Sequence, residues 1–149
     1  IGGGLTPAYH AALEGGYGIS RAGVQGGVPS LGFSAGAMIA AEHAILGGWR
    51  IGGVAVAPEE TAEDLDEITV VPGIGLVDVS VDVHVAQWGT LTRLIAATES
   101  AAVDGGVGID ESTALIADAE GLRIAGAGSV WRVFAGSDGV TVSSDRAAR

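Results

Sequence analysis

The chain lacks cysteine, lysine and any long uninterrupted hydrophobic run. Without cysteine it can form no disulfide, no thiolate metal site and no cysteine nucleophile, which suits a reducing cytoplasm. Seven arginines against 18 acidic residues leave a net charge of −11, which disfavours nucleic acid and anionic membranes as partners. The longest helix-like apolar stretch, 35–46, contains Glu42 and His43, and it falls short of the ~18 residues that a membrane span needs. We therefore expect a cytoplasmic protein.

The length of 149 residues and the hydrophobic content of 48% predict one α/β domain, 1–149, with a proper core. The start, Ile1 to Gly4, has no initiator methionine and no charged segment followed by an apolar one. This pattern predicts that there is no signal peptide and that the chain is cut or processed at its front.

Glycine clusters separate runs with clear periodicity, as turns separate packed elements. Helices are predicted at 6–13, 35–46 and 90–100. Strands are predicted at 28–33, 68–71, 76–83, 114–117, 122–125, 130–134 and 140–142. Alternating strands and helices followed by a strand-rich tail indicate a layered, mostly parallel sheet with antiparallel additions at one edge. The run 59–67 holds six acids in nine positions and is predicted to be exposed.

The most informative motif is Gly32-Phe33-Ser34-Ala35-Gly36, a Gly-x-Ser-x-Gly pattern between a predicted strand and a predicted helix. A sharp turn at this place lifts the serine hydroxyl off the sheet, and small flanking residues let strand and helix approach. The first N–H groups of the helix can stabilise an oxyanion. Ser34 in a glycine-rich turn could also serve only as a helix cap, but the strand–turn–helix context favours a nucleophile.

A serine nucleophile needs a base, and the chain has three histidines. His10 and His43 lie within predicted helices, where structural or surface roles are expected. His84 ends the alternating strand, so the loop after it lies at the carboxyl edge of the sheet, where ligands bind in open α/β sheets. His84 is therefore the predicted base.

The acid that orients the base has three candidates. Glu111 is favoured because it follows a glycine turn, and of the adjacent carboxylates Asp110 and Glu111 only one is expected to face His84. Asp82 is the rival, since it lies two residues before His84 on the same strand and so on the same face. The histidines and acids lack the spacing of metal ligands, so neither a metal nor another cofactor is predicted.

These motifs form part of a longer pattern. The stretches that carry it are 1–7, 32–37, 82–84 with 93–94, and 108–114. With them the chain resembles the serine peptidase family of dipeptidase E (aspartyl dipeptidase) and cyanophycinase. The resemblance implies a class I glutamine amidotransferase-like (flavodoxin-like) fold and a triad of Ser34, His84 and Glu111. It also implies an oxyanion hole formed by the backbone amides of Gly3, Gly4 and Ala35.

The resemblance further implies a small peptide or isopeptide substrate, cleaved at an aspartyl residue through an acyl-enzyme. Gln87, Trp88 and Arg93 are the predicted substrate-binding residues. Cyanophycinase-like sequences carry additional arginines soon after the histidine, whereas Arg93 is the first cation here, so an altered preference for acidic residues is expected. An esterase or amidase on the same fold, or a catalytically inactive binding protein or fragment, are the alternative functions.

Members of this family have further strands before the Gly-Gly loop, and this chain begins at that loop. We therefore expect an N-terminally incomplete domain that exposes apolar surface. A second copy of the chain or a missing N-terminal segment would cover this surface.

Overall fold

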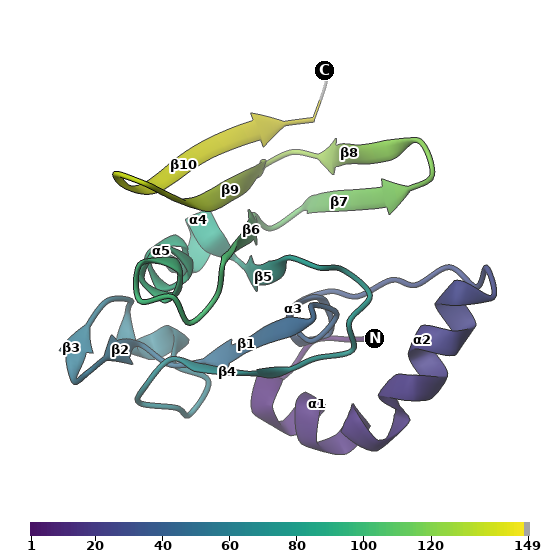
Figure 1. The fold of residues 1–149 in the computed structure, drawn as a ribbon, viewed down its shortest axis with the longest axis horizontal. Coiled ribbons are helices and arrows are strands. Elements are labelled where there is room, and N and C mark those ends of the chain that lie inside the picture. The colour runs from purple at the N-terminus through teal and green to yellow at the C-terminus, as the bar shows by residue number, and fades with distance from the viewer. Residues whose placement is uncertain (148–149) are drawn as a thin grey trace.

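A computed structural model describes residues 1–147, which fold as a mixed α/β protein (Figure 1). The helices are α1 (Thr6–Leu13), the 3-10 turn η1 (Glu14–Gly16), α2 (Tyr17–Gln25), α3 (Ala35–Met38), the 3-10 turn η2 (Glu59–Thr61), α4 (Val85–Trp88) and α5 (Leu91–Glu99). The strands are β1 (His43–Gly47), β2 (Arg50–Ile51), β3 (Val54–Ala55), β4 (Thr69–Pro72), β5 (Ser80–Val83), β6 (Gly105–Ile109), β7 (Thr113–Asp118), β8 (Gly121–Gly126), β9 (Ser129–Gly136) and β10 (Gly139–Arg146).

The largest sheet has the strand order β10-β9-β6-β5. Within it β5 and β6 pair in parallel, while β6–β9 and β9–β10 are antiparallel. The pairs β1–β4, β2–β3 and β7–β8 form separate antiparallel ribbons. Among residues 1–147, β5–β6 is the only parallel pair of named strands, so the predicted mostly parallel layered sheet is not confirmed. The antiparallel additions at one edge are confirmed by β9 and β10.

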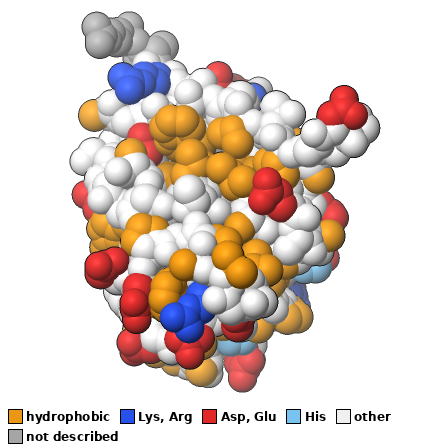
Figure 2. Space-filling view, turned by 90° about the vertical axis from the view of Figure 1, so that its left-hand side faces the viewer, with side chains coloured by type: hydrophobic (Ala, Val, Ile, Leu, Met, Phe, Trp, Pro, Cys, Tyr) orange, Lys and Arg blue, Asp and Glu red, His pale blue; other side chains and the backbone are white. Residues whose placement is uncertain are grey.

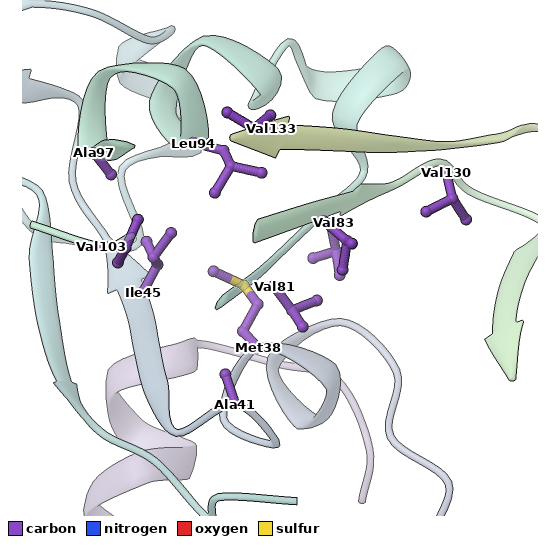
Figure 3. Close-up of a cluster of buried hydrophobic side chains, with 11 residues drawn as sticks. Met38, Ala41, Ile45, Val81, Val83, Leu94, Ala97, Val103, Val130 and Val133 are labelled. Carbon is purple, nitrogen blue, oxygen red and sulfur yellow. The ribbon is translucent and has the colours of Figure 1, made fainter. Parts of the chain in front are cut away.

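The main core lies between the large sheet, α5 and the ribbon β1–β4. Figure 3 shows Met38, Ile45, Val81 and Leu94 pointing toward one another from four different elements. All four side chains are buried. This core holds the ends of β5 and β6 and the helix α3 in fixed relative positions, and these three elements carry the site described below.

The predicted helix 35–46 is wrong beyond Met38. After α3 the chain turns, and His43 begins β1 rather than lying in the middle of a helix. The backbone of 39–42 bonds instead to residues 73–77, through Ile74 N–H to Ile39 O at 2.7 Å and Glu42 N–H to Val77 O at 2.9 Å. The helix propensity of this alanine-rich segment is weak compared with these tertiary hydrogen bonds and the burial of β1.

The predicted buried strand 28–33 is also wrong. Val28, Leu31 and Phe33 are 60%, 75% and 61% exposed, and the segment forms no ladder with another strand among the described residues. Pro29 removes one backbone donor, which weakens any strand at this place. The predicted strand 76–83 is shorter in the structure, where Ser80–Val83 forms β5 and Val77 makes only an isolated bridge to Ala41. The helix predicted at 6–13 is present with the predicted ends. The helix predicted at 90–100 and the strands predicted at 68–71, 114–117, 122–125, 130–134 and 140–142 are present with shifted ends.

Exposed apolar side chains are numerous, as the sequence predicted. Figure 2 shows one face of the molecule, on which hydrophobic side chains gather in the upper half while acidic side chains are concentrated toward the lower edge. Ile19 on α2 and Phe134 on β9 are 80% and 51% exposed. Within residues 1–147, no helix has both the length and the apolar character required to cross a membrane.

Candidate active site

Ser34 lies in a strained turn directly before α3. Its backbone has φ 52° and ψ −124°, a combination that non-glycine residues rarely adopt. Both glycines of the motif are needed for close packing. A side chain at Gly32 would overlap the carbonyl of Gly36, and a Cβ at Gly36 would lie 2.5 Å from the carbonyl oxygen of Ile1. The turn is therefore held by backbone contacts that tolerate no larger residue at either glycine.

The N-terminal segment braces this turn, and Figure 1 shows the N-terminus beside α3. Gly36 N–H donates to Gly2 O at 3.0 Å, and Phe33 N–H donates to Ile1 O at 3.2 Å. A Cβ at Gly3 would lie 2.8 Å from the Cβ of Ser34. The glycine loop thus packs directly against the serine, and only a residue without a side chain fits there.

His84 is brought to Ser34 by the end of β5. Its Nε2 lies 3.0 Å from Ser34 Oγ, although the two residues are 50 positions apart in the sequence. His84 has φ 57° and ψ 30°, a left-handed conformation between β5 and α4. This conformation ends the strand, so the imidazole does not follow the alternation of side chains between the two faces of the sheet along β5.

Glu111 completes a hydrogen-bonded line, because its Oε1 lies 3.0 Å from His84 Nδ1. The adjacent Asp110 is buried and faces the other way. Its oxygens accept hydrogen bonds from Ser129 N–H at 2.8 Å and from Trp131 Nε1–H at 2.9 Å. The prediction that only one of these two carboxylates faces His84 is confirmed, and that carboxylate is Glu111.

Asp82 and Arg93 are not at the site. Both are buried and form a bidentate pair, with Arg93 Nε 2.8 Å from Asp82 Oδ2 and Nη2 2.7 Å from Oδ1. A third guanidinium nitrogen donates to Thr61 O at 2.6 Å. The prediction that Arg93 binds substrate is therefore wrong, and so is the alternative that Asp82, in place of Glu111, orients His84. Asp82 and His84 were expected on the same face of the strand because they are two residues apart. His84 leaves the strand conformation, so the two side chains point in different directions.

The ion pair also determines the charge state of Arg93. Burial by itself lowers the pKa of the guanidinium, but the charge and hydrogen bonds of Asp82 outweigh burial, with a smaller contribution from Glu63. The net result is a raised pKa, so Arg93 stays charged. Its hydrogen-bonding groups are committed to the interior of the protein.

The short helix α4 places two further side chains against the site. Gln87 Oε1 accepts a hydrogen bond from Glu111 N–H at 2.9 Å. The indole of Trp88 stacks on the imidazole of His84, with ring centroids 4.2 Å apart and an interplanar angle of 18°. This stacking was missed in the sequence, although the spacing of four residues between His84 and Trp88 places them on neighbouring turns of a helix.

The predicted oxyanion donors lie around the serine. Within residues 1–147, the N–H groups of Gly3, Gly4 and Ala35 donate no hydrogen bond to another protein group. These amides are therefore not committed to other protein groups; Gly4 is exposed and Gly3 partly exposed, whereas Ala35 is fully buried. The helix α3 has only four residues, so its individual N–H groups matter more here than a summed helix dipole.

The remaining histidines take other roles. His10 Nδ1 lies 3.0 Å from Tyr17 Oη, and its Nε2 lies 3.3 Å from Glu14 Oε2. His43 is exposed at the start of β1. Among the residues that the structure describes, no group of three histidine, aspartate or glutamate side chains is arranged as metal ligands would be.

Five residues of the acidic run 59–67 are exposed, as predicted for the run, while Thr61, Ala62, Glu63 and Leu65 are buried or partly buried. Thr61 is buried, and the carboxylate of Glu63 is half-buried and accepts a hydrogen bond from Thr6 N–H at 2.8 Å. Together with Trp49 and Trp88, residues 59–66 line a cavity of about 640 Å³. The cavity therefore extends from the acidic loop to the residue that stacks on His84.

No protein-family model matches the chain, and neither does any curated protein sequence.

Proposed function

We propose that the protein is a serine hydrolase in which Ser34 is the nucleophile, His84 the general acid and base, and Glu111 the acid that orients the imidazole. The observation that carries this proposal is the continuous hydrogen-bonded line from Ser34 Oγ through both ring nitrogens of His84 to Glu111, with both contacts at 3.0 Å. This is the geometry by which a serine triad is recognised, whatever the order of its residues in the chain.

The chemistry follows from this line. Ser34 Oγ attacks the carbonyl carbon of the substrate while its proton passes to His84 Nε2. His84 Nδ1–H donates to Glu111, whose charge stabilises the imidazolium. The imidazolium then protonates the leaving nitrogen or oxygen as the bond to the carbonyl carbon breaks. Water then gives a proton to the same imidazole as its oxygen attacks the acyl carbon, and the imidazolium returns that proton to Ser34 Oγ as the ester bond breaks and the acid product leaves.

The negative oxygen of the tetrahedral intermediate needs donors that are already in place. The proposed donors are the N–H groups of Ala35 and of the Gly3-Gly4 loop, and the packing of Gly3 against Ser34 supports this role for the loop. The strained backbone of Ser34 is further support, since such strain persists only where surrounding contacts impose it.

The proposed class of substrate is a small peptide or isopeptide, by resemblance to dipeptidase E and cyanophycinase and to their amidotransferase-like fold. Arg93 cannot hold a substrate carboxylate, because Asp82 and Thr61 O occupy its guanidinium. The cation that was predicted to bind the carboxylate of an aspartyl substrate is therefore not available, and a strong preference for such substrates is not expected. We expect kcat/KM for Asp-Leu to exceed that for Ala-Leu by less than roughly 10³-fold, which is about 4 kcal/mol.

A fluorophosphonate tests the nucleophile without any assumption about the substrate. The expected product is a single adduct on Ser34, formed as the Oγ–P bond replaces the P–F bond, with fluoride released and the serine proton taken by His84. Ser34→Ala should remove both labelling and turnover, by roughly 10⁴-fold or more, with an unchanged melting temperature.

Absence of labelling in the wild-type protein, or undiminished turnover by Ser34→Ala, would contradict the proposed mechanism. Turnover of Asp-Leu, Ala-Leu, a β-Asp-Arg isopeptide and a simple ester then separates the peptidase from an esterase or amidase. Labelling of Ser34 without turnover of any of these substrates would favour the alternative that the chain is a catalytically inactive binding protein.

A further inference from the structure

The stacking of Trp88 on His84 restricts a rotation of the imidazole that the two hydrogen bonds of the triad do not prevent. The two bonds of the imidazole lie on opposite edges of the ring, at Nε2 toward Ser34 and at Nδ1 toward Glu111. Two anchors on one line do not prevent the ring from rotating about that line. A flat group against one face of the ring does prevent it, and the indole of Trp88 lies there, 18° from parallel.

Trp88 itself is held by the backbone of the same turn. Its N–H donates to His84 O at 2.7 Å, which ties the position of Trp88 to that of the histidine. The residue is 45% exposed, so its contact with His84 is not explained by a need to fill the core. The stack leaves one edge of the imidazole for the serine and the other for Glu111.

The stack also acts on the charge that forms during catalysis. When His84 takes the proton of Ser34, the imidazolium lies over the electron-rich face of the indole, which attracts cations. Since this attraction is absent for the neutral ring, it stabilises the proton-transfer step and not the resting state.

We propose that Trp88 is a positioning residue for His84, which it holds in the plane required for proton transfer and stabilises as imidazolium. The proposal rests on the proposed serine hydrolase function. It differs from the role predicted from the sequence, in which Trp88 binds substrate. A substrate-binding residue would affect binding of the peptide, whereas a positioning residue affects activation of Ser34 with any reagent.

The test is the rate at which a small fluorophosphonate labels Ser34 in wild type, Trp88→Leu, Trp88→Phe and Trp49→Leu. Trp88→Leu should label about tenfold more slowly, which corresponds to about 1.4 kcal/mol. Trp88→Phe retains an aromatic face and should recover most of the rate. Trp49 lines the same cavity without stacking on His84, so Trp49→Leu should label at the wild-type rate.

With a peptide substrate, Trp88→Leu should lower kcat with KM nearly unchanged and leave the melting temperature within about 2 °C, a shift expected from an exposed position. Labelling of Trp88→Leu at the wild-type rate would overturn the proposal, and so would equal losses in the leucine and phenylalanine variants. A failure of the wild-type protein to label is a separate result, because it removes the serine hydrolase itself and the positioning role with it.

A measurement on the wild-type protein keeps the proposal testable if Trp88→Leu does not fold. The ring current of the indole should displace the proton resonances of the His84 imidazole upfield in the NMR spectrum, relative to those of His43. Resonances of His84 at the positions of an exposed histidine would show that the stack is absent in solution, and would overturn the proposal.

Discussion

Two pairs of side chains begin at neighbouring positions near the end of β5, Asp82 with Arg93 and His84 with Glu111, and their surroundings differ. Asp82 and Arg93 have side chains 0% and 2% exposed, whereas His84 and Glu111 have side chains 21% and 45% exposed. The buried pair ties β5 to α5 and to the carbonyl of Thr61. The half-exposed pair has a serine at one end. The difference teaches that a fully buried carboxylate such as Asp82 serves the fold, whereas the partly exposed carboxylate of Glu111, linked to Ser34 through His84, remains in reach of solvent.

The largest expected effect comes from breaking the buried pair. Arg93→Met leaves the carboxylate of Asp82 buried without a cation, and we expect the free energy of unfolding to fall by about 3–5 kcal/mol. Urea denaturation measures it.

Removing both charges, as in Asp82→Leu with Arg93→Met, should recover much of this loss, because no unpaired charge remains. The control is Arg123→Met, which breaks the exposed pair with Asp118 and should leave the urea midpoint nearly unchanged. Equal midpoints for Arg93→Met and Arg123→Met would contradict the assignment of the Asp82–Arg93 pair to the fold.

Glu111→Gln tests the half-exposed pair. An amide oxygen can still accept the hydrogen bond of His84 Nδ1, but it carries no charge to stabilise the imidazolium. We expect kcat to fall by roughly 10²–10³-fold, less than for a fully buried triad acid because solvent screens Glu111. The melting temperature should stay the same.

Glu14→Gln is the matched control, since Glu14 pairs with His10 away from the serine. Its turnover should equal that of the wild type. If Glu14→Gln lost as much turnover as Glu111→Gln, the effect would come from the loss of any negative charge and not from the contact between Glu111 and His84.

The smallest effect is expected in the acidic run 59–67. Asp64 and Asp66 are exposed, so the double change to asparagine should alter the free energy of unfolding by no more than about 0.5 kcal/mol. The change should instead reduce the salt dependence of KM for a charged peptide, because the field at the cavity weakens. A large fall in kcat with KM unchanged would show that this run reaches the reacting atoms.

The local motif was the part of the site most open to prediction. Gly32, Ser34 and Gly36 could be recognised because the spacing follows from the contacts of a tight turn. His84 could be selected because it ends a predicted strand, at the edge of the sheet where ligands bind. Glu111 was favoured because it follows a glycine-rich segment that was predicted to be a turn, and that segment is the strand β6 in the structure. The structure brings these residues together, and their catalytic roles remain a proposal.

Pairing between distant segments was the part that sequence reasoning missed. The segment 39–46 contains good helix formers, yet residues 73–77 take its backbone hydrogen bonds and β4 pairs with it as β1. The role of Arg93 was missed for the same reason, since nothing near it in the sequence reveals that Asp82 is buried beside it.

The sequence by itself determined the turn at Ser34, because Gly32 and Gly36 are the residues that its close backbone contacts require. It also determined the helix α5 and the positions of the short strands of the C-terminal half. Only the tertiary structure decided which carboxylate serves His84. That choice depends on the left-handed backbone of His84 and on the burial of Asp82 and Asp110, which arise when β5, β6 and α5 pack around one core and local sequence does not encode them.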